Sequence, residues 1–103
     1  MLILRREAEA DVRAAYEWYE RQREGLGRIF LAEIDRLMAS VEEQPEIYSE
    51  LYRSVRRALC RRFPDAIYFV RRNPNIVILG VLHQRRHPWL RQRRVTFPPS
   101  FQR

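Results

Sequence analysis

The sequence predicts an α+β domain of order β-α-α-β-β-β, in which a helical hairpin packs on a curved, mainly antiparallel sheet of four strands. Two amphipathic stretches come first and short apolar runs follow. The segment 51–86 contains the runs FPDAIYFV and IVILGVL, which are rich in aromatic and β-branched residues and are separated by RRNPN. Asn and Pro in that separator predict a hairpin loop, so we expect the two runs to be neighbouring antiparallel strands.

The first half of the chain predicts a short strand at 2–4 and two helices joined by Gly25-Leu26-Gly27, which interrupts the helical pattern. The first helix is expected from about residue 7 and the second at about 28–43, before Pro45. One face of the first helix carries apolar residues at helical spacing: Ala8, Val12, Ala15, Tyr16 and Tyr19. Because each helix has only one apolar face, the strands must supply the surface that buries it.

In the second half, we expect the first strand of the antiparallel meander at 52–59, with Arg57 on the same side as Val55. If that side faces the core, Arg57 would pair with a helix acid such as Asp35 or Glu33. Such a pair would give Arg57 a structural role in place of a functional one.

The length of 103 residues predicts one domain, 1–103, and the 46% hydrophobic content is typical of a folded chain. The segment 87–103 shows no clear period, and we expect it to be irregular. No apolar run reaches the ~18 residues of a membrane helix, and the N-terminus lacks the pattern of a signal peptide, so we expect a cytoplasmic protein. The lone Cys60 is expected to be a small buried hydrophobe.

The sequence shows no Gly-rich phosphate loop, no cysteine pair for zinc and no acidic cluster for magnesium. We therefore predict no metal, no cofactor and no small-molecule substrate. Lysine is absent as well, so no lysine chemistry is available.

The charge is distributed unevenly along the chain. The net charge is +7, and all 20 basic residues are arginines. Residues 1–52 hold 7 arginines against 12 acids, a net charge of −5, whereas residues 53–103 hold 13 arginines against Asp65 alone, a net charge of +12. This asymmetry predicts an acidic partner for the C-terminal half, either a polyanion or an acidic protein.

The order of elements and several short motifs together resemble the RelE/ParE superfamily of bacterial toxins, the toxin halves of type II toxin–antitoxin modules. The resemblance covers roughly residues 2–94. The motifs that carry it are Ala10-Asp11, Tyr16-Glu17-Trp18-Tyr19-Glu20, Gly25-Leu26-Gly27, Phe30, Ile34-Asp35, Pro45, Val55-Arg56-Arg57, Arg62-Phe63-Pro64-Asp65-Ala66-Ile67-Tyr68-Phe69, Val81-Leu82-His83, Arg86 and Pro88. No single motif is specific, but the ordered set is.

The resemblance implies one of two targets. RelE-like members cut messenger RNA in the ribosome, and ParE-like members are taken to poison DNA gyrase. RNA cleavage needs a base, an acid and cations around the phosphate, and here arginines are plentiful but a base is not. The resemblance implies that RelE-like nucleases commonly place a tyrosine near the C-terminus and that some use lysines, whereas this sequence has no tyrosine after Tyr68 and no lysine. His83 is the best candidate base, followed by Glu50. We therefore expect a ParE-like gyrase inhibitor that is not an enzyme, with an mRNA endoribonuclease as the alternative.

A cognate antitoxin is the partner that the resemblance implies, with an acidic or disordered C-terminal segment that lies across the helical hairpin and the sheet. A second alternative, from another class, is a basic nucleic-acid-binding module, whose affinity would fall steeply with salt. The α+β order without a recognition-helix pattern makes that alternative less favoured.

Three sets of candidate site residues follow. The catalytic set, which applies if the chain is a nuclease, is His83, Arg57 and Arg86. The target-binding set is Arg57, Arg62, Arg85, Arg86 and Trp89. The antitoxin-binding set is Trp18, Phe30, Arg56 and Arg71.

Structural interpretations stay open beside these functional ones. His83 could cap a strand and hydrogen-bond a carbonyl, and Arg61 with Arg62 could form a solvated strand end. Arg85 and Arg86 could be a polar rim. Phe30 also fits the apolar stripe of the second helix, which favours a place in the core.

Overall fold

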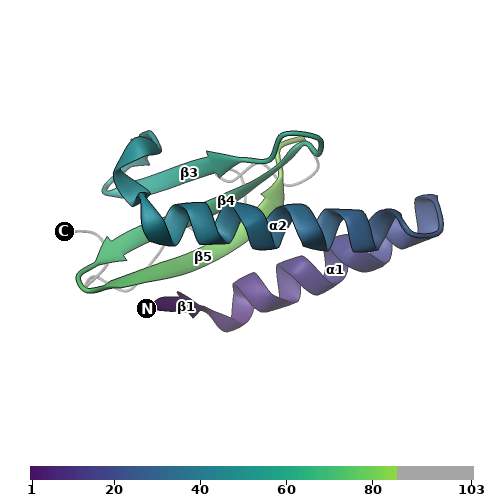
Figure 1. Ribbon diagram of the computed structural model, residues 1–103, viewed down its shortest axis with the longest axis horizontal. Helices are drawn as coiled ribbons and strands as arrows, with labels where there is room; N and C mark the ends of the chain where they lie inside the picture. Colours follow the sequence, from purple (N-terminus) through teal and green to yellow (C-terminus); the bar gives the residue numbers. More distant parts are fainter. Residues whose placement is uncertain (86–103) are drawn as a thin grey trace.

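The computed structural model describes residues 1–85. Arg86, Trp89 and the segment 87–103, on which some of the predictions fall, lie outside the described residues. The elements in chain order are β1 (Leu2–Leu4), α1 (Arg6–Gln22), α2 (Leu26–Glu43), the 3₁₀ turn η1 (Pro45–Ile47), β2 (Glu50–Tyr52), β3 (Val55–Leu59), β4 (Asp65–Arg72) and β5 (Asn75–His83). The predicted α+β class and the order of helices before the meander are confirmed (Figure 1).

The sheet has five strands in the order β1-β5-β4-β3-β2. β1 runs parallel to β5, and the other neighbours are antiparallel. The prediction of four strands was wrong because the expected strand at 52–59 is two strands, β2 and β3, joined by a tight turn at Arg53 and Ser54. Both turn residues have positive φ, 47° and 69°, a conformation that Gly or Asn normally signals in a hairpin. Neither residue is present there, so the turn carried no sequence signal.

The helical hairpin depends on the tight junction between α1 and α2. Gly25 has a φ of 90°, a left-handed conformation that glycine adopts without strain. The Glu20 carboxylate accepts hydrogen bonds from the backbone N–H groups of Gly25, at 2.8 Å, and Gly27, at 2.9 Å. The Gly25 hydrogen bond is the main reason why the pKa of Glu20 lies below its usual value. This carboxylate takes the place of a capping side chain, so α2 begins at Leu26, two residues before the predicted start.

Gly27 also lets the two helices approach closely. A Cβ atom at this position would lie 2.7 Å from the carbonyl oxygen of Tyr16 on α1. Only glycine fits that contact without a shift of the backbone. The Gly25-Leu26-Gly27 segment therefore fixes both the turn and the spacing of the hairpin.

One apolar cluster lies between the hairpin and the sheet. Its centre is an aromatic group: Tyr19 lies 5.0 Å from Phe30 and 4.8 Å from Phe63 between ring centroids. Ile67 and Phe69 of β4 contribute the sheet side of this cluster. In Figure 1, α2 crosses the sheet with α1 beside it.

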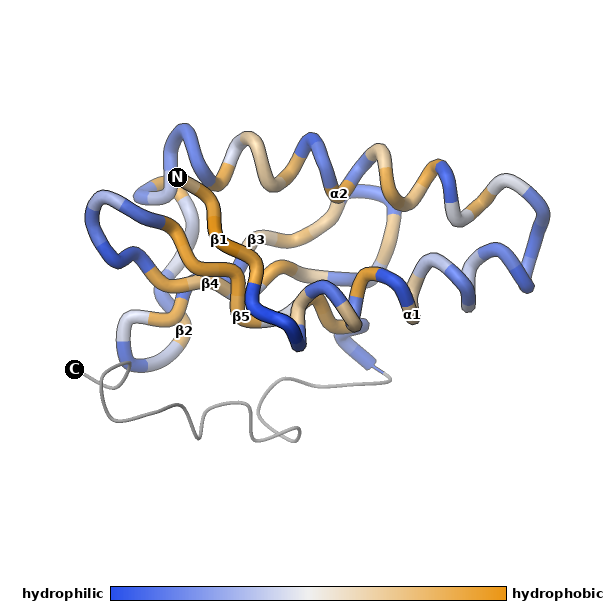
Figure 2. Tube along the Cα trace, turned by 90° about the horizontal axis from the view of Figure 1, so that it is seen from below, coloured by the Kyte–Doolittle hydropathy of each residue, from blue (hydrophilic) through white to orange (hydrophobic). Residues whose placement is uncertain are grey.

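A second buried apolar cluster uses the alternate residues of the same strands. Its members are Val55, Ala66, Tyr68, Val70, Val77, Leu79 and Leu82. Because successive residues of a strand point to opposite faces, this cluster lies on the face of the sheet away from the helices. Burial on both faces explains why β4 and β5 are nearly continuous apolar runs, coloured as hydrophobic in Figure 2.

Neither helix within residues 1–85 is long and apolar enough to cross a membrane.

Candidate functional site

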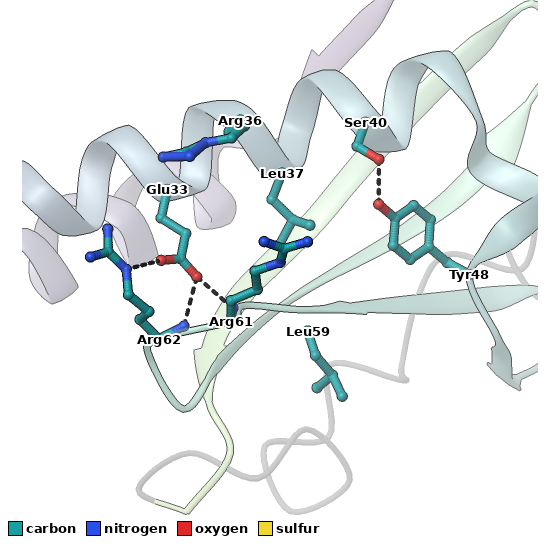
Figure 3. A pocket seen from close by; sticks show the side chains of 8 residues that line it. All are labelled: Glu33, Arg36, Leu37, Ser40, Tyr48, Leu59, Arg61 and Arg62. Atoms are coloured by element: carbon teal, nitrogen blue, oxygen red, sulfur yellow. Dashed lines mark hydrogen bonds and ion pairs between the residues drawn. The ribbon is translucent and has the colours of Figure 1, made fainter.

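A cleft of about 470 Å³ lies between α2 and the end of β3. It is lined by Glu33, Arg36, Leu37, Ser40, Tyr48, Leu59, Arg61 and Arg62 (Figure 3). We call it the α2/β3 cleft. Four of these residues follow one another on α2 at positions 33, 36, 37 and 40, which is the spacing of one helix face.

Glu33 anchors the loop that forms one wall of the α2/β3 cleft. Its carboxylate, 7% exposed, accepts hydrogen bonds from the backbone N–H groups of Arg61 and Arg62, the latter at 3.0 Å. The Arg62 guanidinium lies 3.4 Å from the same carboxylate. Burial tends to raise the pKa of Glu33, but the hydrogen bonds from Arg62 and Arg61 outweigh it, so the pKa lies below its usual value. The carboxylate is therefore charged at neutral pH and ties the loop after β3 to α2.

Two other arginines border the α2/β3 cleft without such a partner. The guanidinium groups of Arg36 and Arg61 make no ion pair or side-chain hydrogen bond within residues 1–85, and both residues are exposed. Leu37 and Leu59 supply apolar surface, and Leu59 is 54% exposed. Tyr48 is fixed by a hydrogen bond between its hydroxyl and that of Ser40. The cleft thus combines apolar surface with an excess of positive charge.

A second cleft, of about 230 Å³, lies between α1 and the paired ends of β4 and β5. We call it the α1/β5 cleft. Its carboxylates serve the fold: Asp11 accepts a hydrogen bond from the Val81 N–H at 2.9 Å, and Asp65 accepts one from the Tyr19 hydroxyl. Asp65 is 1% exposed. These bonds join α1 to the sheet at both strands.

His83, the predicted base, lies at the end of β5 and lines the α1/β5 cleft. Its Nδ1 accepts a hydrogen bond from the Arg85 N–H at 3.0 Å. In the neutral ring this places the proton on Nε2, so Nδ1 could accept a proton from a substrate only after its hydrogen bond with the Arg85 N–H breaks. His83 thus lies at the end of β5 as the capping interpretation expects, but its observed hydrogen bond is with a backbone N–H and not with a carbonyl.

Arg57 lies on the face of the sheet away from the helices, with Val55. Its guanidinium donates to the side chain of Gln84 at 3.3 Å, and Gln84 donates to the Tyr68 hydroxyl at 2.7 Å. The expected pairing of Arg57 with Asp35 or Glu33 was wrong, because those acids lie on α2, on the other side of the sheet. Glu33 pairs with Arg62 instead.

The target-binding candidates Arg57 and Arg62 do not share a face of the sheet. Arg62 is held by Glu33 on the helix side of the sheet, whereas Arg57 lies on the opposite face. Arg85 is exposed just after β5. Arg86 and Trp89 lie beyond the residues that the structure describes.

The antitoxin-binding candidates are similarly divided. Phe30 has no exposed surface, so its assignment to an antitoxin contact was wrong. It lies in the core, as its position in the apolar stripe of the second helix favoured. Trp18 is half-buried in the α1/β5 cleft. Arg56 donates to the Tyr48 carbonyl at 2.6 Å, and exposed Arg71 lies 3.9 Å from Glu46. Arg71 thus contacts η1 and Arg56 contacts its C-terminal cap, whereas Trp18 lies on α1.

Cys60 is half-buried and packs against the apolar cluster between the hairpin and the sheet, so it is less buried than the small buried hydrophobe that we expected. Burial is the main cause that raises the pKa of its thiol to about 12, and the carboxylates of Asp65 and Glu33 add to the effect. A thiol with such a pKa is a poor nucleophile at neutral pH.

Sequence reasoning missed Arg36, Leu37 and Leu59 as site residues. The helix-face spacing of Glu33, Arg36, Leu37 and Ser40 was the available signal. The other wall of the cleft, formed by the loop after β3, had no sequence signal, because its contact with Glu33 joins residues 28 positions apart.

Comparison with known proteins places the chain in a family. Residues 2–88 match the family described as ParE toxin of type II toxin-antitoxin system, parDE. Among solved structures, one described as "Chromosomal ParDE TA system from P. aeruginosa" aligns with a TM-score of 0.70 and 22% sequence identity, over 80% of this chain and 92% of that chain. That likeness shows the fold. The comparison with curated proteins gave no match. Since the family match spans most of the sequence, the chain belongs to the ParE toxin family of type II toxin–antitoxin systems.

Proposed function

We propose that this ParE-family toxin acts in the cytoplasm by inhibiting DNA gyrase and that a cognate antitoxin neutralises it. The observation that carries the proposal is the family match over residues 2–88. The structural relative from P. aeruginosa is likewise described as part of a ParDE system. The alternative to be tested against this proposal is ribosome-dependent cleavage of messenger RNA.

The geometry around the candidate bases favours gyrase inhibition over RNA cleavage. His83 accepts a backbone hydrogen bond at Nδ1. Glu50, the second candidate, accepts one from the Ser54 N–H at 3.1 Å in the turn between β2 and β3. Tyr68 is 2% exposed and its hydroxyl is bound by Gln84. Each of these three groups therefore makes a hydrogen bond within the chain. This supports gyrase inhibition, because a gyrase inhibitor needs no proton transfer.

The test is controlled expression of the toxin in bacteria without its antitoxin. We expect growth arrest with filamentation and a DNA-damage response, while messenger RNA stays intact. In a supercoiling assay, the purified toxin should inhibit gyrase. A His83→Ala variant should keep this inhibition if it folds, because His83 has no proposed role in gyrase binding.

The opposite outcome is equally clear. Cleavage of ribosome-bound messenger RNA that is lost in the His83→Ala variant would establish the nuclease alternative. Undiminished growth at a high yield of folded protein would show that the protein is not toxic.

A further inference from the structure

We propose that the segment 86–103 packs across the outer face of the sheet, which is the face away from the two helices, and buries the apolar side chains there. The outer face is defined by the second apolar cluster: Val55, Ala66, Tyr68, Val70, Val77, Leu79 and Leu82. The proposal goes beyond the proposed function and does not depend on gyrase inhibition or on an antitoxin. It assigns a partner within the chain to this surface.

The side chains of the outer face are buried, although all of them belong to strands. Val55 and Ala66 have no exposed surface, and Leu79 is 1% exposed. A fully buried side chain is in contact with several other residues. Neighbouring strands lie beside these side chains and not above them, so burial to this degree requires a further layer over the face.

Neither helix supplies that layer. Every buried apolar residue of α1 and α2 belongs to the first cluster, between the hairpin and the sheet, whereas the outer cluster contains residues of β3, β4 and β5 alone. The connections face the same way as the helices, since Tyr48, Cys60 and Phe63 also pack in the first cluster. Within residues 1–85, no apolar side chain from a helix or a loop joins the outer cluster.

The described part of the chain ends next to the outer face. The Gln84 N–H donates to the Pro64 carbonyl at 2.7 Å, and the Gln84 side chain donates to the Tyr68 hydroxyl at 2.7 Å on the outer face. After Arg85 the sequence continues for the 18 residues 86–103, which span at most roughly 60 Å. The nine residues of β5 are about 30 Å long, so the segment is long enough to cross the whole face.

The sequence of the segment contains the side chains that such a layer requires. Its large apolar residues are spread along its length: Trp89, Leu90, Val95, Phe97 and Phe101. Three of the five are aromatic, and each aromatic side chain can bury about 150–250 Å². The segment also holds five arginines and no acid. Their long side chains can keep the guanidinium groups in water while the apolar residues pack on the strands.

A second copy or another protein fits the outer face less well. A docking face for another molecule would be exposed in the single chain, but the outer face is already buried there. Leu59 provides the contrast, because it lies on the same side of β3 as Val55 and is 54% exposed. The layer therefore covers β4, β5 and the start of β3, and it ends before Leu59.

This placement has a consequence for the charge of the second half of the chain. The five arginines of the segment 86–103 join Arg57 on the outer side of the sheet. A negatively charged partner that approaches this side then meets guanidinium groups and not the apolar side chains of the strands.

The direct test is NMR spectroscopy of the full-length protein with isotope-labelled methyl groups. We expect nuclear Overhauser contacts between the Leu79 methyl groups and aromatic protons of the segment 86–103. The matched control is Ile78, the preceding residue of β5, which belongs to the cluster on the helix side and should show no contact with the segment. No contact at Leu79, or equal contacts at both residues, would overturn the proposal.

A mixed sample distinguishes the chain's own segment from that of a second copy. Labelled and unlabelled chains are unfolded together and refolded, and contacts between the two kinds of chain are recorded selectively. We expect none at Leu79. If the contacts join different chains, a second copy covers the outer face and the proposal is wrong.

Substitutions in the segment test the same layer by stability. Trp89→Asp/Phe97→Asp places two charges where apolar contacts are proposed, and the urea midpoint should fall by about 1 M. The matched control, Gln92→Asp/Ser100→Asp, adds the same charges at polar positions of the segment and should lower the midpoint by less than about 0.3 M. Equal midpoints for the two variants would contradict the proposal. If the first variant does not fold at all, the NMR contacts of the wild type decide.

Discussion

The two clefts of this toxin differ in whether their charged side chains have partners within the described chain. In the α1/β5 cleft, the carboxylates of Asp11 and Asp65 accept hydrogen bonds from the chain itself and join α1 to the strands. In the α2/β3 cleft, Glu33 is used in the same manner, but Arg36 and Arg61 have no carboxylate partner within residues 1–85. In the first cleft the carboxylates are hydrogen-bonded within the chain, and in the second two guanidinium groups have no carboxylate partner among the described residues.

This difference separates charges that hold the fold from charges that are available to a partner. A buried polar group whose partner is removed costs its full desolvation, whereas an exposed charge without a partner contributes little to stability. Substitutions in the two clefts should therefore have effects of different size on the free energy of unfolding. We make three predictions, from the largest expected effect to the smallest, and the first concerns the α1/β5 cleft.

The largest effect is expected for Asp65→Ala. This carboxyl is 1% exposed, and its loss leaves the buried Tyr19 hydroxyl without its acceptor. We expect the free energy of unfolding to fall by about 2–3 kcal/mol, measured by urea denaturation. The control is Asp35→Ala, which removes an exposed acid from α2 and should cost less than about 0.5 kcal/mol. If the two variants lose equal stability, the α1/β5 cleft does not hold the fold.

A smaller effect is expected for Glu33→Gln, and this effect should depend on pH. The folded-state pKa of Glu33 is lowered, so its charge stabilises the fold above the usual value of 4.5. That contribution is lost as the pH falls through the folded pKa. At pH 7 the variant should be less stable by about 1 kcal/mol, because the hydrogen bonds from Arg61 and Arg62 lose a charged acceptor.

The measurement compares the two proteins by urea denaturation between pH 7 and pH 3. The stability difference should shrink as the pH falls below the usual carboxyl value of 4.5, because protonation of Glu33 then removes the contribution of its charge. A difference that stays constant across this range would mean that the charge of Glu33 contributes nothing to the attachment of the loop.

The sequence predicted this architecture where a signal is local and missed it where the signal is distant. Helical spacing and Gly25-Leu26-Gly27 located the hairpin, and the Asn-Pro separator located the turn between β4 and β5. The turn at Arg53 and Ser54 was missed because neither residue is typical of positive φ. Local propensity determines the hairpin and the β4–β5 turn, whereas tertiary packing overrides local propensity at Arg53 and Ser54.

The candidate site was harder to predict than the fold. Glu33 contacts Arg62 across 29 positions, and no pattern in the sequence links them. Arg57 was placed correctly beside Val55, but which face meets the helices cannot be derived when both faces of the strands are apolar. That ambiguity produced the incorrect pairing of Arg57 with a helix acid.

The smallest effect on stability is expected for Arg36→Ala, and its smallness is the informative result. Arg36 is exposed and makes no ion pair in the described part of the chain, so its removal should change the free energy of unfolding by less than about 0.5 kcal/mol. The same denaturation assay measures it, beside Glu33→Gln as the reference from the same helix face. A loss above about 1 kcal/mol would show that this guanidinium serves the fold after all. A near-zero change would mean that folding does not require this charge, so the role of Arg36 must then be sought in what the α2/β3 cleft binds.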